Sequence, residues 1–450
     1  MKTYLINLWD GVRGSYWFVP ALLAVVALVL SIVMPWVDQG FADAGFELPA
    51  WAATRSEAAQ TTLSAAAGAM IGVSGTVFSI TIVTLSLTSQ QFGPRLLRQF
   101  MYDLLTQITL GVFLATGFYC LLILRTVEIT HDPTPPHFSM LVAAIMVVTS
   151  MMLLIAFIHH VSQMIQAPHV VASVAKDLDD AIDRLFPERL GEAGGEKEGS
   201  APPATCAESS VLPPAPHLKV LAQKEGYVQA IDAHGMMELA EESNATLRLA
   251  IRPGDFLVYQ ILLAEVWFHG EPADTSSFSE RLNEAVIVGI RRTPRQDLEC
   301  AIDELVEVAV RSLSPGINDP FTAMNCVDRL AAAVGRIAQR QLPAPYRYDQ
   351  DGMLRVIVPE ERFAGVLDAA FNQIRQYGRD SVAVTIRMLE AFERICPHLF
   401  RQEDAEAMLQ HARMLARHAD EFREQHDRDD VLRRYQRVEH AVQHLLAREQ

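Results

Sequence analysis

The chain has 450 residues, half of them apolar, with a net charge of −16 and five scattered cysteines. This length accommodates two or three domains, and the apolar share exceeds that of an ordinary soluble protein. The negative charge excludes nucleic acid as a partner, because phosphates would be repelled, and cysteines without paired spacing fit a reducing compartment better than a disulfide framework.

Most of the apolar excess lies in the first 165 residues, which we assign to a transmembrane domain. Four segments there are each long enough to cross a hydrocarbon core about 30 Å thick: residues 16–36, 62–87, 106–124 and 138–158. Tyr16 and Trp36 bracket the first segment, as interfacial aromatic residues do. A cleaved signal peptide is the alternative for that segment, although its apolar core is longer than the core of a typical signal peptide.

The second segment is rich in hydroxyl side chains and carries no charge. Its candidate pore-lining residues fall on two helical faces: Thr76, Ser79 and Ser86 on one, and Ser74, Thr81 and Thr84 on the other. Two interpretations stay open. The hydroxyls line a path for ions or solutes, or they bond to a carbonyl one turn back and mediate helix packing, as Gly68 and Gly72 would.

The chain that follows this helix has the composition of an inner pore mouth, with Gln90, Gln91, Arg95 and Arg98. The alternative is a connector whose arginines meet lipid phosphates. The loop between the first two segments is instead mainly acidic, so the positive-inside rule places both termini in the cytoplasm.

The rest of the chain is charged and predicts an α+β cytoplasmic domain. We expect four parts: residues 166–186 as a helical extension of the fourth span, 187–217 as a flexible linker, 218–295 as a small β module, and 296–450 as a mainly helical domain.

The motif Ser-Pro-Gly-Ile-Asn-Asp-Pro at residues 314–320 separates two predicted helices of that last part. Asn318 or Asp319 can cap the second helix, with Pro320 in its first turn, so a structural loop is the favoured interpretation. If the soluble half holds a ligand site, the expected residues are Asn318, Asp319, Arg291, Arg292 and Arg311.

Four stretches together resemble the bacterial predicted-membrane-protein family catalogued as domain of unknown function 2254: residues 74–103, 221–232, 252–256 and 312–330. The resemblance spans nearly the whole chain, and SLTSQQFGPRLL and SPGINDP are its most specific parts. It implies four N-terminal spans, a cytoplasmic C-terminal domain and a bacterial inner membrane. It implies no catalytic residue.

No GxSxG, P-loop, HExxH, GxGxxG or CxxC motif occurs, so we expect neither an enzyme nor a cofactor or metal site. We expect a homo-oligomeric channel for ions or small solutes, in which the second helix lines the pore and the cytoplasmic domain forms a vestibule or gate. The alternative is a membrane-anchored scaffold or sensor whose cytoplasmic domain binds a protein. The expected partners are membrane lipid, further copies of the chain and ions.

Overall fold

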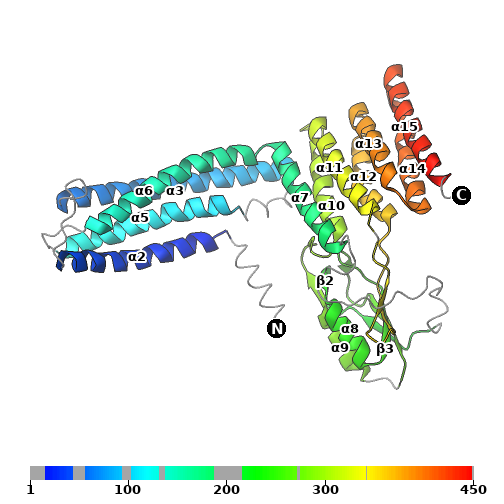
Figure 1. The fold of residues 1–450 in the computed structure, drawn as a ribbon, viewed down its shortest axis with the longest axis horizontal. Helices are drawn as coiled ribbons and strands as arrows, with labels where there is room; N and C mark the ends of the chain where they lie inside the picture. Colours follow the sequence, from blue (N-terminus) through cyan, green and yellow to red (C-terminus); the bar gives the residue numbers. More distant parts are fainter. Residues whose placement is uncertain are drawn as a thin grey trace. The chain divides into compact units, whose positions relative to one another are not determined.

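A computed structural model describes residues 16–43, 56–93, 103–130, 137–186, 215–270, 274–340 and 342–447. The chain divides into two compact units, Met1–His169 and Val170–Gln450. The predicted fold class is confirmed, because four long apolar helices precede a unit of strands and many helices (Figure 1). The predicted linker falls largely on residues 187–214, which lie outside the described residues.

The first unit is a bundle of four helices: α2 Phe18–Asp43, α3 Ser56–Phe92, α5 Leu104–Thr130 and α6 His137–Met164. All four are long and apolar enough to cross a membrane. Their side chains are mostly apolar on every face, which is typical of helices surrounded by lipid. The protein is therefore a membrane protein with four candidate spans.

Helix α5 is the centre of the bundle and packs against the other three helices. Two glycines permit the close approach. A β-carbon on Gly111 would lie 3.0 Å from the Cα of Pro20 in α2, and one on Gly117 would lie 3.0 Å from Ile71 in α3. Small residues at such contacts let helices associate in lipid, where no hydrophobic effect drives them together.

One end of the bundle is fastened by Asp38 of α2. Its carboxylate accepts hydrogen bonds from the backbone N–H groups of Phe138, at 2.7 Å, and Ser139, at 3.1 Å. These donors belong to the first turn of α6, where no helical acceptor exists, so Asp38 caps a helix that follows 100 residues later. Tyr119 of α5 donates to the carbonyl of Ser139 at the same end.

Helix α7, Ala167–Leu185, is separate from α6 rather than a continuation of it as we had expected. Helix α6 ends at Met164, and Ile165 and Gln166 form a turn before α7 begins. Pro168 explains the break, because it cannot continue the hydrogen-bond ladder of α6 but fits the first turn of a new helix. The apolar side of α7 is buried and includes Val171, Val174 and Ile182.

Helix α7 pairs with α11, Pro320–Ala338, through arginines. Arg336 pairs with Asp179, and Arg340 contacts Asp183 at 2.5 Å. Both pairs join residues that are 157 positions apart in the sequence. An equal sequence separation at two successive contacts means that the two helices run parallel.

Two sheets form the β part of the second unit. One has the order β1-β5-β3-β8-β7 and the other β4-β2-β6. Their strands are β1 Leu218–Leu221, β2 Gly226–Ile231, β3 Ala245–Leu249, β4 Phe256–Leu257, β5 Leu262–Phe268, β6 Val286–Gly289, β7 Tyr346–Tyr348 and β8 Leu354–Ile357. Helices α8, Ala233–Glu242, and α9, Thr275–Ala285, are capped by Asp232 and Asp274. A common apolar core includes Val228, Leu247, Ala264 and Phe278.

The β part draws on more of the chain than residues 218–295. Strand β8 pairs in parallel with β3, with Leu247 opposite Val356, so residues beyond 345 complete the larger sheet. Strands β1 and β2 follow one another closely in the sequence but belong to different sheets.

The remaining helices form a helical layer: α10 Leu298–Ser312, α11, α12 Phe363–Tyr377, α13 Val382–Ile395, η3 Cys396–His398, α14 Gln402–Arg417, η4 His418–Glu421 and α15 Gln425–Leu446. Helices α10 and α11 form a hairpin whose loop is the SPGINDP motif. The layer buries one apolar face of each helix, and Phe371 and Phe392 meet edge to face at its centre.

Candidate functional site

Helix α3 divides its hydroxyl groups between two faces. Ser74, Thr81 and Thr84 are buried and lie on the face that packs against α5. The Ser74 hydroxyl donates to the carbonyl of Met70 at 2.7 Å, and the Thr81 hydroxyl donates to that of Val77 at 2.9 Å. These are bonds one turn back, and Thr76 on the exposed face makes the same kind of bond, to the carbonyl of Gly72 at 3.3 Å.

The opposite face of α3 is exposed along the whole helix. We call Gly68, Gly72, Gly75, Thr76, Ser79 and Ser86 the exposed stripe. At 100° per residue, its centre lies about 180° from the buried face. A β-carbon on any of the three glycines would meet nothing within 4 Å, so no other part of the described chain covers them.

The exposed stripe changes character along the helix. Its first half is glycine, whereas its second half carries the hydroxyls of Thr76, Ser79 and Ser86 and ends at the exposed Gln90 and Gln91. The large apolar side chains of Phe78 and Ile80 flank it, and Val83 lies on it; all three are also exposed. Helix α3 contains no charged residue after Glu57. Arg95 and Arg98, the other inner-mouth candidates, lie outside the described residues.

A polar cluster that our sequence interpretation did not assemble lies where α5 begins. Asp103 caps α5 by accepting from the Thr106 N–H at 2.9 Å, and its other oxygen lies 2.9 Å from Nε2 of His160 in α6. Thr88 and Gln107 are buried in the same bundle. The Asp-x-x-Thr spacing signals the cap, but the partnership with His160 depends on tertiary structure.

The ligand candidates of the soluble unit are not brought together. Arg311, Asn318 and Asp319 lie at the C-terminal end of α10, whereas Arg291 and Arg292 precede its N-terminal end. A helix of 15 residues separates the two groups by about 22 Å, since each residue adds about 1.5 Å. No single small ligand can contact both groups.

The backbone conformation and the helix-capping contacts of the SPGINDP loop account for its sequence. Asp319 caps α11 by accepting from the N–H groups of Phe321 and Thr322, both at 3.1 Å. Asn318 has a φ of 49°, a left-handed conformation that asparagine tolerates better than most residues. Arg311 contacts Glu307 one turn back at 3.1 Å. These contacts fit the structural interpretation of the loop.

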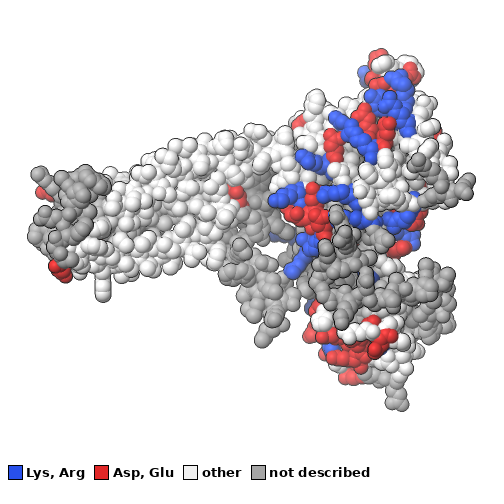
Figure 2. Space-filling model, in the orientation of Figure 1, with Lys and Arg blue, Asp and Glu red and all other residues white. Residues whose placement is uncertain are grey.

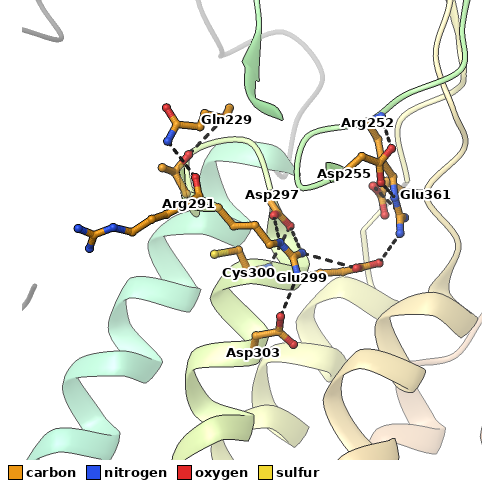
Figure 3. Close-up of polar contacts among 11 residues, drawn as sticks. Gln229, Arg252, Asp255, Arg291, Asp297, Glu299, Cys300, Asp303 and Glu361 are labelled. Carbon is orange, nitrogen blue, oxygen red and sulfur yellow. Dashed lines mark hydrogen bonds and ion pairs between the residues drawn. The ribbon is translucent and has the colours of Figure 1, made fainter. Parts of the chain in front are cut away.

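Arg292 is the candidate with the densest contacts (Figure 3). Its guanidinium donates to both oxygens of Asp297, at 2.7 and 2.9 Å, and to Asp303 at 3.0 Å. Asp297 is buried and also caps α10 through the Cys300 N–H. The hydrogen bond with Asp297 raises the pKa of Arg292, so the pair remains charged.

A second arginine continues this network. Arg252 lies 3.0 Å from Glu299 and 4.0 Å from Glu361. Burial raises the pKa of Glu361, and Arg252 opposes that effect. Gly254, with a φ of 98°, sits against Asp297 and Arg292, where a β-carbon would collide with the carboxylate. The network therefore joins the 252–255 loop to the start of α10, and Arg291 points away from it (Figure 3).

The cysteines behave as core residues. Cys120, Cys300, Cys326 and Cys396 are buried thiols, and Cys206 lies outside the described residues. Burial raises the pKa of the Cys326 and Cys396 thiols to about 12, which leaves them protonated and unreactive. Within the described ranges, no group of three or more His, Cys, Asp and Glu side chains is placed to hold a metal ion.

Residues 13–394 match a family described as predicted membrane protein (DUF2254). The chain is 31% identical over 368 residues to uncharacterized protein Rv1290c of Mycobacterium tuberculosis, strain H37Rv, which covers 81% of this chain and 68% of that relative. The same values hold for uncharacterized proteins Mb1321c of Mycobacterium bovis and MT1328 of Mycobacterium tuberculosis, strain CDC 1551. No solved structure matches the chain significantly.

Proposed function

The chain belongs to the predicted membrane protein family DUF2254, and we propose that it assembles with further copies of itself in the bacterial inner membrane into a channel for ions or small solutes. The exposed stripe of α3 faces the shared axis in this assembly. Thr76, Ser79 and Ser86 line the path, and Gln90 and Gln91 lie at its cytoplasmic mouth.

The observation that carries this proposal is the division of α3 into two opposite polar faces. The buried face accounts for Ser74, Thr81 and Thr84 within one copy, so these three residues do not line the path. The exposed face has hydroxyls and amides that nothing else in the described chain covers. Hydroxyls without charge hydrogen-bond to water or to a solute that is losing its hydration shell.

A single copy cannot enclose an aqueous path with one helix face, so assembly is part of the proposal. The glycines of the exposed stripe permit contact between copies. Gly68, Gly72 and Gly75 let neighbouring backbones approach closely, while the flanking Phe78 and Ile80 pack against a neighbour or lipid.

The charge distribution supports an orientation with both termini in the cytoplasm. Asp38 and Asp43 lie in the last turns of α2, and Glu47 and Arg55 lie between α2 and α3, whereas Arg95 and Arg98 follow α3. The soluble unit is then cytoplasmic, on the side of the membrane where the hydroxyl-lined half of α3 ends, and serves as vestibule or gate.

Cysteine accessibility in intact membranes tests the proposal. Single cysteines at Ser79 and Ser86 should react with a small, water-soluble, membrane-impermeant thiol reagent. Cysteine at Ser74, on the buried face, and at Ile80, on the apolar flank, should stay protected as matched controls. Protection of Ser79→Cys and Ser86→Cys to the same degree as Ser74→Cys would refute the pore and leave the membrane unit as an anchor.

A further inference from the structure

The tip of the α10–α11 hairpin carries large apolar side chains that the soluble unit leaves exposed. Ile317 is 42% exposed and Phe321 is 77% exposed. Tyr377, 60% exposed, joins them, because Leu313 lies 3.4 Å from the position of a β-carbon on the neighbouring Gly378. We call these three residues the hairpin-tip surface.

Helix α7 shows which end of the second unit this surface occupies. Each residue of α7 lies beside the residue of α11 that comes 157 positions later in the sequence. Ala167, the first residue of α7, therefore lies at the level of residue 324 in α11. Phe321 therefore lies about one turn before that level. Arg184, near the other end of α7, bonds to the carbonyls of Pro294 and Arg295 just before α10, which confirms that α10 runs opposite to α7.

Chain connectivity brings that end of the unit near lipid. Only Ile165 and Gln166 join the fourth candidate span to α7. The first turn of α7 therefore follows the fourth candidate span directly in the chain, and within the second unit the hairpin-tip surface lies at the level of that turn.

We propose that the hairpin-tip surface inserts into the interface of the bilayer that the chain itself spans, with Phe321 and Ile317 at the level of the acyl chains and Tyr377 among the headgroups. Large apolar residues exposed together mark an interaction surface, and aromatic residues favour the membrane interface. This role gives the SPGINDP motif a purpose beyond ending α10, and it does not depend on whether α3 lines a pore.

The charges around the tip favour apolar insertion over attraction to anionic lipid. Arg311 is paired with Glu307, Arg379 lies 3.8 Å from Asp380, and Asp319 is used as a helix cap. The tip of the hairpin is drawn as mainly uncharged atoms in Figure 2. Insertion should therefore be the same in zwitterionic and anionic bilayers.

Spin labels on the full-length protein in lipid nanodiscs test the inference. Phe321→Cys and Tyr377→Cys, each on a Cys206→Ala background because the other cysteines are buried, carry the label. Phe400→Cys is the matched control. Phe400 is also exposed, at 66%, but it follows η3, whose His398 lies near Gly335 at the far end of α11.

Insertion predicts that labels at 321 and 377 collide more with oxygen and less with an aqueous nickel chelate than the label at 400, in nanodiscs of either lipid charge. Equal, water-like collision rates at all three positions would overturn the inference. Protection at 321 from both reagents, with dipolar broadening between labels of neighbouring copies, would also overturn it, because a second copy rather than lipid would then cover the tip.

Discussion

The imidazole of His411 is buried between α12 and α14, with only 4% of the residue exposed. Its Nε2 lies 3.2 Å from Asp368, and its Nδ1 has no hydrogen-bond partner among the described residues. Burial lowers the pKa of His411 below the usual 6.5, and the carboxylate of Asp368 only partly opposes this effect. The neutral form is therefore the one that the folded soluble unit accommodates.

This burial predicts a pH dependence of stability. Below pH 6.5 the unfolded chain takes up a proton at His411 that the folded chain resists, so the free energy of unfolding falls as the pH drops from neutrality towards the folded-state pKa. His411→Gln, which cannot titrate, should flatten this slope in denaturant unfolding followed between pH 7 and pH 5. An unchanged slope would show that other groups cause the acid sensitivity.

Single residues show where the sequence was informative. The cap at Asp319 was predictable, because capping depends on residue type and on the proline that follows. Arg291 and Arg292 were not distinguishable, since adjacent arginines look alike until the fold places Asp297 and Asp303 beside one of them. For the same reason Asp103 was missed, because its partner His160 is 57 residues away.

The charged network around Arg292 holds two elements together, the 252–255 loop and α10. Arg292→Ala would leave the buried Asp297 without its charge partner and should cost about 2 kcal/mol, less than the ~3–5 kcal/mol of a fully buried pair because the Arg292 side chain is 23% exposed.

Arg291→Ala is the matched control for this loss. Its side chain is exposed and points away from the network, so its effect should stay within about 0.5 kcal/mol. Denaturant unfolding of the soluble unit in the detergent-solubilised full chain compares the two. Equal losses would mean that the network does not stabilise the fold.

The glycines exposed on α3 are expected to form the contact between copies of the chain. Gly72→Ile adds bulk to the exposed stripe, where nothing within one copy stands in its way, so it should break the assembly into single copies without unfolding them. Gly117→Ile, facing Ile71 inside the bundle, should instead destabilise each copy. Mass measurement in nanodiscs and thermal unfolding separate the two effects. A Gly72→Ile protein of unchanged mass would show that the exposed stripe is not the contact between copies.

Local patterns predicted the elements better than their pairing. Apolar length predicted the four membrane helices. Apart from the start of α2, which lies two residues inside its predicted segment, the helix ends extend past the predicted segments, as helices continue into the headgroup region. The parallel contact of β3 with β8 joins residues more than 100 apart, which no local pattern indicates. Helix α7 was mistaken for part of the fourth span, although Pro168 was a readable sign of a new helix.

At the scale of the whole molecule, the chain combines a membrane bundle with a large acidic unit that has its own apolar core. The bundle packs around α5, and among the described residues nothing covers one polar face of α3. The proposal of a channel rests on that uncovered face, because the exposed Ser79, Ser86, Gln90 and Gln91 gather there without a charge and would meet water in a channel.

Single-channel recording from the purified protein in planar bilayers tests this claim most directly. A pore lined by the exposed stripe should carry a current that falls in Ser79→Cys protein when a charged thiol reagent is added, and that persists in Ser74→Cys protein, whose cysteine lies on the buried face of α3. Absence of any current in bilayers that contain correctly assembled protein, or a current that the reagent leaves unchanged in Ser79→Cys, would contradict it.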